Sequence, residues 1–191
     1  MHRKLMYFLY NLHVYAYMHS IHKETITADI NRWAEVLHWQ GDAIKNLKKL
    51  LYCKPEFRNL FYYRLQSKFV RILSLIAKPI STLFIWTENI GPGLFIQHGF
   101  ATVIAAKSIG KNAWINQQVT IGYKDDTASP IIGDNVSICA GAIILGDILV
   151  GNDSTIGANA VVTKNVPEKT VIIGSKAFII KKDGKKVYIP L

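Results

Sequence analysis

An aliphatic residue recurs about every six positions between Ile90 and Val162. Several of these residues are followed by glycine: Ile90-Gly91, Ile109-Gly110, Ile121-Gly122, Ile132-Gly133, Val150-Gly151 and Ile156-Gly157. Others keep the same register with a different following residue: Ile96, Val103, Ile115, Ile138, Ile144 and Val162. A six-residue period is too short for a helical solenoid, but it fits one flat face of a parallel β-helix with coils of about eighteen residues. The pattern therefore predicts stacked coils that bury one aliphatic side chain per face.

Two interruptions break this period. The step from Ile96 to Val103 is seven residues long and contains His98, the sole histidine of the repeat region. The step from Ile121 to Ile132 is eleven residues long and contains the run 123–130. Solenoids accommodate insertions as loops at one corner, where binding commonly occurs. We expect the functional residues at these two loops.

The residues of the repeat region resemble a known family. Gly91-Pro92-Gly93-Leu94-Phe95-Ile96-Gln97-His98, together with Val162-Thr163-Lys164-Asn165-Val166-Pro167, is similar to the hexapeptide-repeat acyltransferases. The similarity is greatest to the serine acetyltransferase-like branch, which includes capsule and lipopolysaccharide O-acetyltransferases. It covers about residues 90–180, and the run 55–65 extends it. The resemblance implies a left-handed parallel β-helix, a homotrimer, acetyl-CoA as acyl donor and a histidine general base.

His98 suits the chemistry of acetyl transfer on grounds of its own. Transfer from a thioester to a hydroxyl needs a group that accepts the hydroxyl proton, and imidazole titrates nearest to neutral pH. The alternative is a loop histidine that bonds to a backbone carbonyl. Because His98 occupies the family's motif position, we expect it to be the general base.

A carboxylate that orients this histidine is harder to identify. Serine acetyltransferases carry an aspartate some fifteen residues before the histidine, where this chain has Leu83. Glu88 is the only acid in the neighbouring stretch and is the candidate for this role. The alternative is a solvated glutamate on the first coil.

Departures from the serine acetyltransferase pattern bear on the acceptor. Gln97 replaces the family's aspartate, and Thr127-Ala128-Ser129-Pro130 replaces its Asp-Arg-His-Pro run. The ammonium and carboxylate of serine each favour an opposite charge or several donors. Neutral groups that suit sugar hydroxyls are present instead, and the candidate substrate-binding residues are Gln97, Asn116, Gln117 and Tyr123.

Three functions therefore remain open. The preferred one is acetyl-CoA-dependent O-acetylation of a sugar or surface-polysaccharide precursor. The alternative is serine O-acetyltransferase activity in cysteine biosynthesis. The third is a non-catalytic scaffold, against which the presence of His98 argues.

Cofactor contacts are inferred from the resemblance and from side-chain size. Small residues let backbone amides approach a pantetheine arm, and Ala140 and Ala158 lie in such corners. Thr163 and Lys164 follow where the family commonly meets the nucleotide. The alternative is that these residues have no role in binding, because small residues at tight corners and solvated lysines occur in any β-helix. We expect no metal site, because a zinc enzyme on this fold would need several histidines on adjacent coils.

The first 86 residues are expected to form a helical cap, followed by the β-helix at 87–180 and a basic tail at 181–191. Asp42 predicts the start of a helix that ends at Cys53, before Pro55. A second helix is expected from Glu56 until Pro79, burying Phe57, Leu60, Phe61, Leu65, Phe69, Ile72 and Ile76. A third is expected over 26–39. The cap would cover the open end of the first coil.

Charge and composition add expectations about partners. Hydrophobic residues make up 50% of the chain and charged residues 19%, which argues against disorder. Two unpaired cysteines and the lack of a signal-peptide pattern favour a reduced, cytoplasmic protein. Residues 1–88 contain thirteen Lys and Arg against six Asp and Glu. This basic region is expected either in a trimer contact with a solvated stripe, which we favour, or at the inner membrane surface. No motif supports nucleic-acid binding.

Overall fold

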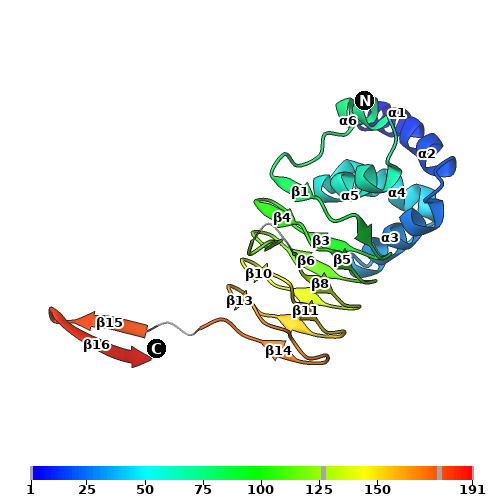
Figure 1. Cartoon of the computed structure of the whole chain (residues 1–191). Coiled ribbons are helices and arrows are strands. Elements are labelled where there is room, and N and C mark those ends of the chain that lie inside the picture. The colour runs from blue at the N-terminus through cyan, green and yellow to red at the C-terminus, as the bar shows by residue number, and fades with distance from the viewer. Residues whose placement is uncertain (1, 126–127, 176–177, 191) are drawn as a thin grey trace.

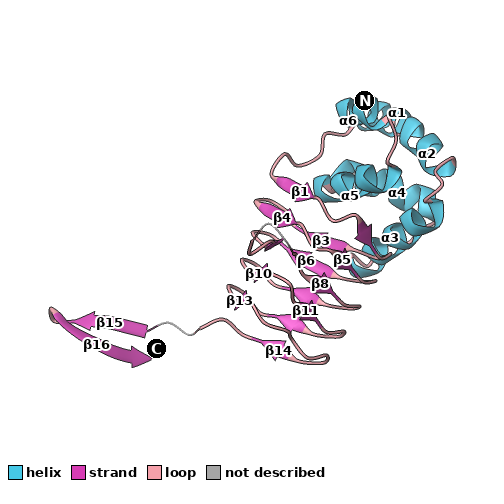
Figure 2. Cartoon of the chain, viewed as in Figure 1, coloured by secondary structure: helices cyan, strands magenta, loops and turns pink. Residues whose placement is uncertain are grey.

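The computed structural model describes residues 2–125, 128–175 and 178–190. A helical cap precedes a parallel β-solenoid, and a hairpin follows it (Figures 1 and 2). Asp126 and Thr127 of the predicted loop lie outside the described residues.

Three parallel sheets form the faces of the solenoid. Sheet A contains β1 (Leu83–Ile85), β4 (Thr102–Ile104), β7 (Thr120–Gly122), β10 (Ile143–Leu145) and β13 (Val161–Val162). Sheet B contains β2 (Asn89–Ile90), β5 (Ser108–Ile109), β8 (Ile131–Ile132) and β11 (Leu149–Val150). Sheet C contains β3 (Phe95–Gln97), β6 (Trp114–Asn116), β9 (Ser137–Ile138), β12 (Thr155–Ile156) and β14 (Val171–Ile172). The parallel solenoid predicted from the six-residue period is confirmed.

The predicted core register is correct at every position but one. Ile96, Ile115 and Ile138 are fully buried and stack on one another in sheet C. Val103 is the exception, because Ile104 instead points into the core and pairs with Ile121. The corner after β3 is therefore one residue longer than the sequence indicates, and three of its residues, His98, Gly99 and Ala101, have positive φ.

Glycines form a column where the chain passes from sheet B to sheet C. A Cβ on Gly91 would lie 2.7 Å from the backbone of Gly110, and one on Gly110 would lie 2.6 Å from that of Gly133. A Cβ on Gly151 would lie 2.4 Å from the next coil. The recurrent glycine after the aliphatic residue thus permits the coils to stack at this edge.

Six helices make up the cap in the described residues: α1 (His2–Leu9), α2 (Asn11–Met18), α3 (Lys23–Val36), α4 (Ala43–Cys53), α5 (Pro55–Leu65) and α6 (Val70–Ile76). The Asp42 side chain accepts from the Lys45 amide and caps α4, as the sequence predicts. The helix expected from Glu56 to Pro79 is wrong as one element. Gln66, with φ of 44°, ends α5, and the turn reorients α6 so that Phe69 and Ile72 are exposed.

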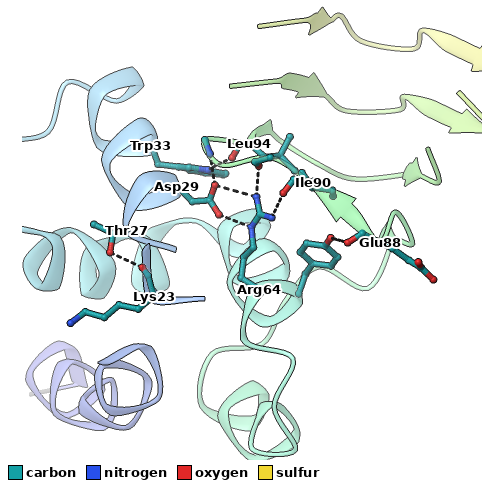
Figure 3. A network of polar contacts seen from close by, with 11 residues as sticks. Lys23, Thr27, Asp29, Trp33, Arg64, Glu88, Ile90 and Leu94 are labelled. Carbon is teal, nitrogen blue, oxygen red and sulfur yellow. Dashed lines mark hydrogen bonds and ion pairs between the residues drawn. The ribbon is translucent and has the colours of Figure 1, made fainter. Parts of the chain in front are cut away.

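The cap is joined to the first coil through the buried pair of Asp29 and Arg64 (Figure 3). Arg64 Nε lies 2.8 Å from Asp29 Oδ2, and the rest of the guanidinium donates to the carbonyls of Ile90 and Gly91. The Gly93 amide donates to Asp29 Oδ1 over 2.7 Å. Burial raises the pKa of the Asp29 carboxyl, while Arg64 and the nearby backbone amides lower it in turn.

Other cap side chains bond to the remaining strands of the first coil. Trp33 Nε1 donates to the Leu94 carbonyl over 2.9 Å, beside β3. Asn59 Nδ2 donates to the Leu83 carbonyl over 3.2 Å, on β1. The first coil has no preceding coil, so these bonds satisfy backbone groups that would otherwise be unpaired at the end of the solenoid.

The chain after β14 differs from the expected division. β15 (Phe178–Lys182) and β16 (Lys185–Pro190) form an antiparallel hairpin that projects from the solenoid (Figure 1). The segment expected as a tail at 181–191 therefore contains most of a hairpin, and the first solenoid strand starts at Leu83 rather than at residue 87. Among the described residues, no helix has the length and apolar character needed to cross a bilayer.

The buried pair generates a stability prediction. Arg64→Met leaves the Asp29 carboxylate buried without its counterion and removes the bonds to Ile90 and Gly91. We expect a loss of about 3–5 kcal/mol in the free energy of unfolding, measured by urea titration. Arg32→Met is the matched control, because it breaks only the more exposed pair with Glu35 and should cost less than about 1 kcal/mol. Equal losses in the two variants would contradict this role for Arg64.

Candidate active site

His98 lies on the edge of the solenoid where the chain passes from sheet C to sheet A. This C–A edge consists of the corner loops 98–101, 117–119, 139–142 and 157–160 of successive coils. His98 directly follows β3, is exposed, and has a φ of 67°. A left-handed backbone is uncommon for a residue other than glycine and recurs at functional positions.

Gln97 and Asn116 form a polar ledge beside His98. They are paired across β3 and β6, and both amide oxygens accept from the Trp114 indole, over 3.2 Å and 2.8 Å respectively. Because the oxygens face the indole, each amide can offer its NH2 group to another molecule. The predicted substrate residues Gln97 and Asn116 are thus adjacent to each other and to the His98 loop.

Gln117 occupies the corner of the next coil along the same edge. Its Oε1 atom is buried and has no hydrogen-bond partner among the described residues. A buried acceptor of this kind favours a donor from a bound molecule. Gln117 thus lies on the same edge as His98, and its expected contact with the acceptor stays a prediction.

Two predicted cofactor residues lie further along the C–A edge. Ala140 is half-buried and Ala158 is exposed, on the corners of the third and fourth coils. Gly141 lies between them with a φ of 71°, and a Cβ there would lie close to Asn159 Oδ1. The corners of the third and fourth coils are consequently lined by small residues, among them Ala140, Gly141, Gly157 and Ala158.

The other predicted residues lie on a different edge, between sheets A and B. Tyr123 is 56% exposed at the start of the inserted loop, and the Cβ of Lys124 lies next to Gly146. Thr163 and Lys164 are exposed on the same edge after β13. Ser129, at the other end of the loop, is buried. Within one protomer, the strands of sheet A separate these residues from His98.

Glu88 also lies between sheets A and B and does not meet His98. Its backbone carbonyl accepts from the Tyr63 hydroxyl over 2.9 Å, and its carboxylate points away from the cap (Figure 3). Glu88 lines a small polar pocket with His22, Tyr63 and Arg64. The structure gives no contact through which Glu88 would orient the imidazole of the same chain.

The structure instead brings Glu56 to the His98 loop. Glu56 is buried in the first turn of α5, and a Cβ on Gly99 would lie 3.2 Å from the Glu56 Cβ. Sequence reasoning did not identify Glu56, because 42 positions separate it from His98 and no period connects them. The only indication was its place in the run 55–65, to which the family resemblance extends.

Metal ligands are not gathered anywhere in the part of the chain that the structure describes. No group of three or more His, Cys, Asp or Glu residues there could hold a metal ion. Cys53 and Cys139 are both free thiols.

Comparisons with known proteins agree with this architecture. The profile of the bacterial transferase hexapeptide family (six repeats) matches residues 129–164. The serine acetyltransferase of Staphylococcus xylosus is 36% identical over 138 residues, which cover 68% of this chain and 64% of that protein. The chain thus spans less than two thirds of the length of this relative.

Solved structures of serine acetyltransferases share the fold. The enzyme of Neisseria gonorrhoeae in complex with serine has a TM-score of 0.60 at 25% identity, covering 81% of this chain and 67% of that one. A serine acetyltransferase in complex with CoA has a TM-score of 0.61 at 26% identity, covering 79% and 66%.

Proposed function

Because the chain belongs to the hexapeptide-repeat transferases, we propose that it transfers an acetyl group from acetyl-CoA to a hydroxyl, with His98 as general base. The observation that carries the proposal is the position of His98. His98 is exposed on the first corner of the C–A edge, beside the side-chain amides of Gln97 and Asn116. The next corners of this edge contain the buried, unpaired Oε1 atom of Gln117 and several small residues.

His98 performs both proton transfers in this mechanism. Its imidazole removes the hydroxyl proton as the oxygen attacks the thioester carbon. It then returns the proton to the departing thiolate when the tetrahedral intermediate collapses. Acetyl-CoA supplies the activated acetyl group. Gln117 Oε1 would accept from an amide N–H of the pantetheine arm, and Ala140 and Ala158 would leave room for that arm.

A second protomer would complete the site. The inserted loop and Lys164 lie on the edge between sheets A and B, whereas His98 lies on the C–A edge. Two edges of one triangular solenoid cannot meet, but those of neighbouring copies can. The proposed homotrimer would therefore bring Tyr123 and Lys164 of one protomer to the His98 edge of the next.

Serine is the acceptor that the comparisons favour, although the sequence placed it second. The curated relative described above is a serine acetyltransferase, and the related Neisseria structure was solved with serine. Glu56, which the sequence did not identify as a site residue and whose Cβ lies beside Gly99 of the His98 loop, would supply a carboxylate for the ammonium of serine. The NH2 groups of Gln97 and Asn116 would donate to its carboxylate.

A sugar hydroxyl is the second candidate. It is favoured by the neutral ledge at Gln97 and Asn116, whose oxygens are held by the Trp114 indole. An indole beside amide donors suits the apolar and polar faces of a sugar ring. A polysaccharide acceptor has no support from the comparisons.

His98→Ala tests the mechanism. Loss of the base should lower kcat by at least roughly a hundredfold, measured as thiol release from acetyl-CoA, without loss of acetyl-CoA binding. His38→Ala is the matched control, because His38 is also exposed and also has a left-handed φ, at 54°. Its turnover should equal that of the unmodified chain. Full turnover by His98→Ala would exclude His98 as the base.

An acceptor panel distinguishes the two candidates. Purified chain is given acetyl-CoA with serine, with free sugars, with nucleotide sugars or with extracted glycolipid. We expect saturable thiol release with serine, because Glu56 and the two amides match its charged groups. Release with a glycan and none with serine would replace the serine proposal by the sugar one, and release with neither would overturn both.

Glu56→Gln tests how the acceptor is held. If Glu56 binds the ammonium, neutralising it should raise KM for serine by at least roughly tenfold and leave the KM for acetyl-CoA unchanged. Glu35→Gln, on the exposed face of α3, is the control for loss of one negative charge. An unchanged KM for serine in Glu56→Gln would show that Glu56 does not contact the acceptor.

A further inference from the structure

Helices α2 and α6 lie toward the end of the cap that is farthest from β14 (Figure 1). An apolar groove is lined by residues on and beside these two helices. Its volume is about 620 Å³. Apolar side chains from both helices line it, among them Leu12, Tyr15, Phe69 and Ile72. The groove and the exposed residues around it are here named the cap face.

Large apolar side chains are exposed on the cap face to an unusual degree. Ile21 is 92% exposed, Leu75 83% and Phe69 68%. Phe8 and Ile72 add to them. Large apolar side chains exposed beside an apolar groove are typical of an interaction site. The break at Gln66 creates this surface, because it turns α6 away from the core.

The segments that line the groove contain basic residues and no acidic ones. Residues 1–23 and 57–87, which include α1, α2 and α6, contain no aspartate or glutamate. Lys68, Arg71 and Lys78 are exposed on or beside α6. Two copies of this face would bring cations against cations, which disfavours a symmetric contact between two caps.

We propose that the cap face docks on a lipid bilayer that contains anionic headgroups. The exposed side chains of Phe69, Ile72 and Leu75 would enter the boundary between headgroups and acyl chains. Lys68 and Arg71 would contact the lipid phosphates. Apolar burial combined with basic side chains is the combination that holds peripheral proteins on anionic membranes. The solenoid would extend away from the bilayer, because the cap face lies at its end, and its His98 edge would stay accessible.

Vesicle co-sedimentation tests the proposal on the full chain. One set of vesicles contains phosphatidylcholine alone, and the other an equal mixture of phosphatidylcholine and phosphatidylglycerol. We expect at least roughly tenfold stronger binding to the mixed vesicles, weakened by high salt. The double variants Ile72→Ser/Leu75→Ser and Lys68→Glu/Arg71→Glu should each lose at least roughly tenfold of that binding.

Matched variants elsewhere give the controls. Val161→Ser/Val171→Ser removes two exposed aliphatic side chains from the solenoid, and Lys181→Glu/Lys186→Glu reverses two charges on the hairpin. Both should bind as the unmodified chain does. Circular dichroism reports whether each variant folds. If Ile72→Ser/Leu75→Ser does not fold, the proposal is tested with Lys68→Glu/Arg71→Glu alone.

Three outcomes would overturn the proposal. The first is equal or no binding of the unmodified chain to the two kinds of vesicle. The second is loss of binding in the hairpin variant with retention in both α6 variants. The third is a smaller mass of the α6 variants in sedimentation equilibrium without lipid, because the cap face would then cover another copy of the chain.

Discussion

The solenoid depends on a partner for its first coil. Every later coil bonds to the coil before it, but β1, β2 and β3 have no predecessor. The buried ion pair of Asp29 and Arg64 forms hydrogen bonds to the backbone of the first coil. Trp33 and Asn59 donate further hydrogen bonds to backbone carbonyls beside β3 and on β1. Because these side chains come from α3 and α5, the same contacts fix the cap on the solenoid. The cap is thereby a structural requirement of the fold and a rigid support for the site.

The stacking of the coils aligns the candidate site residues along one edge of the solenoid. Aliphatic side chains from the three faces fill the core of the solenoid, and the register repeats each corner on the next coil. His98, Gln117, Ala140 and Ala158 share one edge for this reason, although 60 positions separate the first from the last. The cap adds Glu56 to the same edge through its packing on Gly99. The surface around His98 is therefore built from local repeats and one long-range contact.

The sequence predicted what the period determines and missed what depends on packing between distant segments. The aliphatic register and the Asp42 N-cap of α4 are local patterns, and the structure confirms them. The pattern misplaced Val103, because an added residue in a left-handed corner leaves no hydrophobic signal. Apolar spacing also continued through Gln66, so the break between α5 and α6 was missed. The sequence indicated Glu88 as the carboxylate near His98, but the structure places Glu56 beside the His98 loop, because this proximity is decided by how α5 packs.

We propose that the C–A edge binds the acetyl donor with its thioester at His98. A crystal structure of the full chain with CoA tests this most directly. We predict that the pantetheine arm lies along Ala158 and Ala140, with an amide N–H donated to Gln117 Oε1 and the sulfur at the imidazole of His98. CoA bound on another edge, with its sulfur away from His98, would contradict the account.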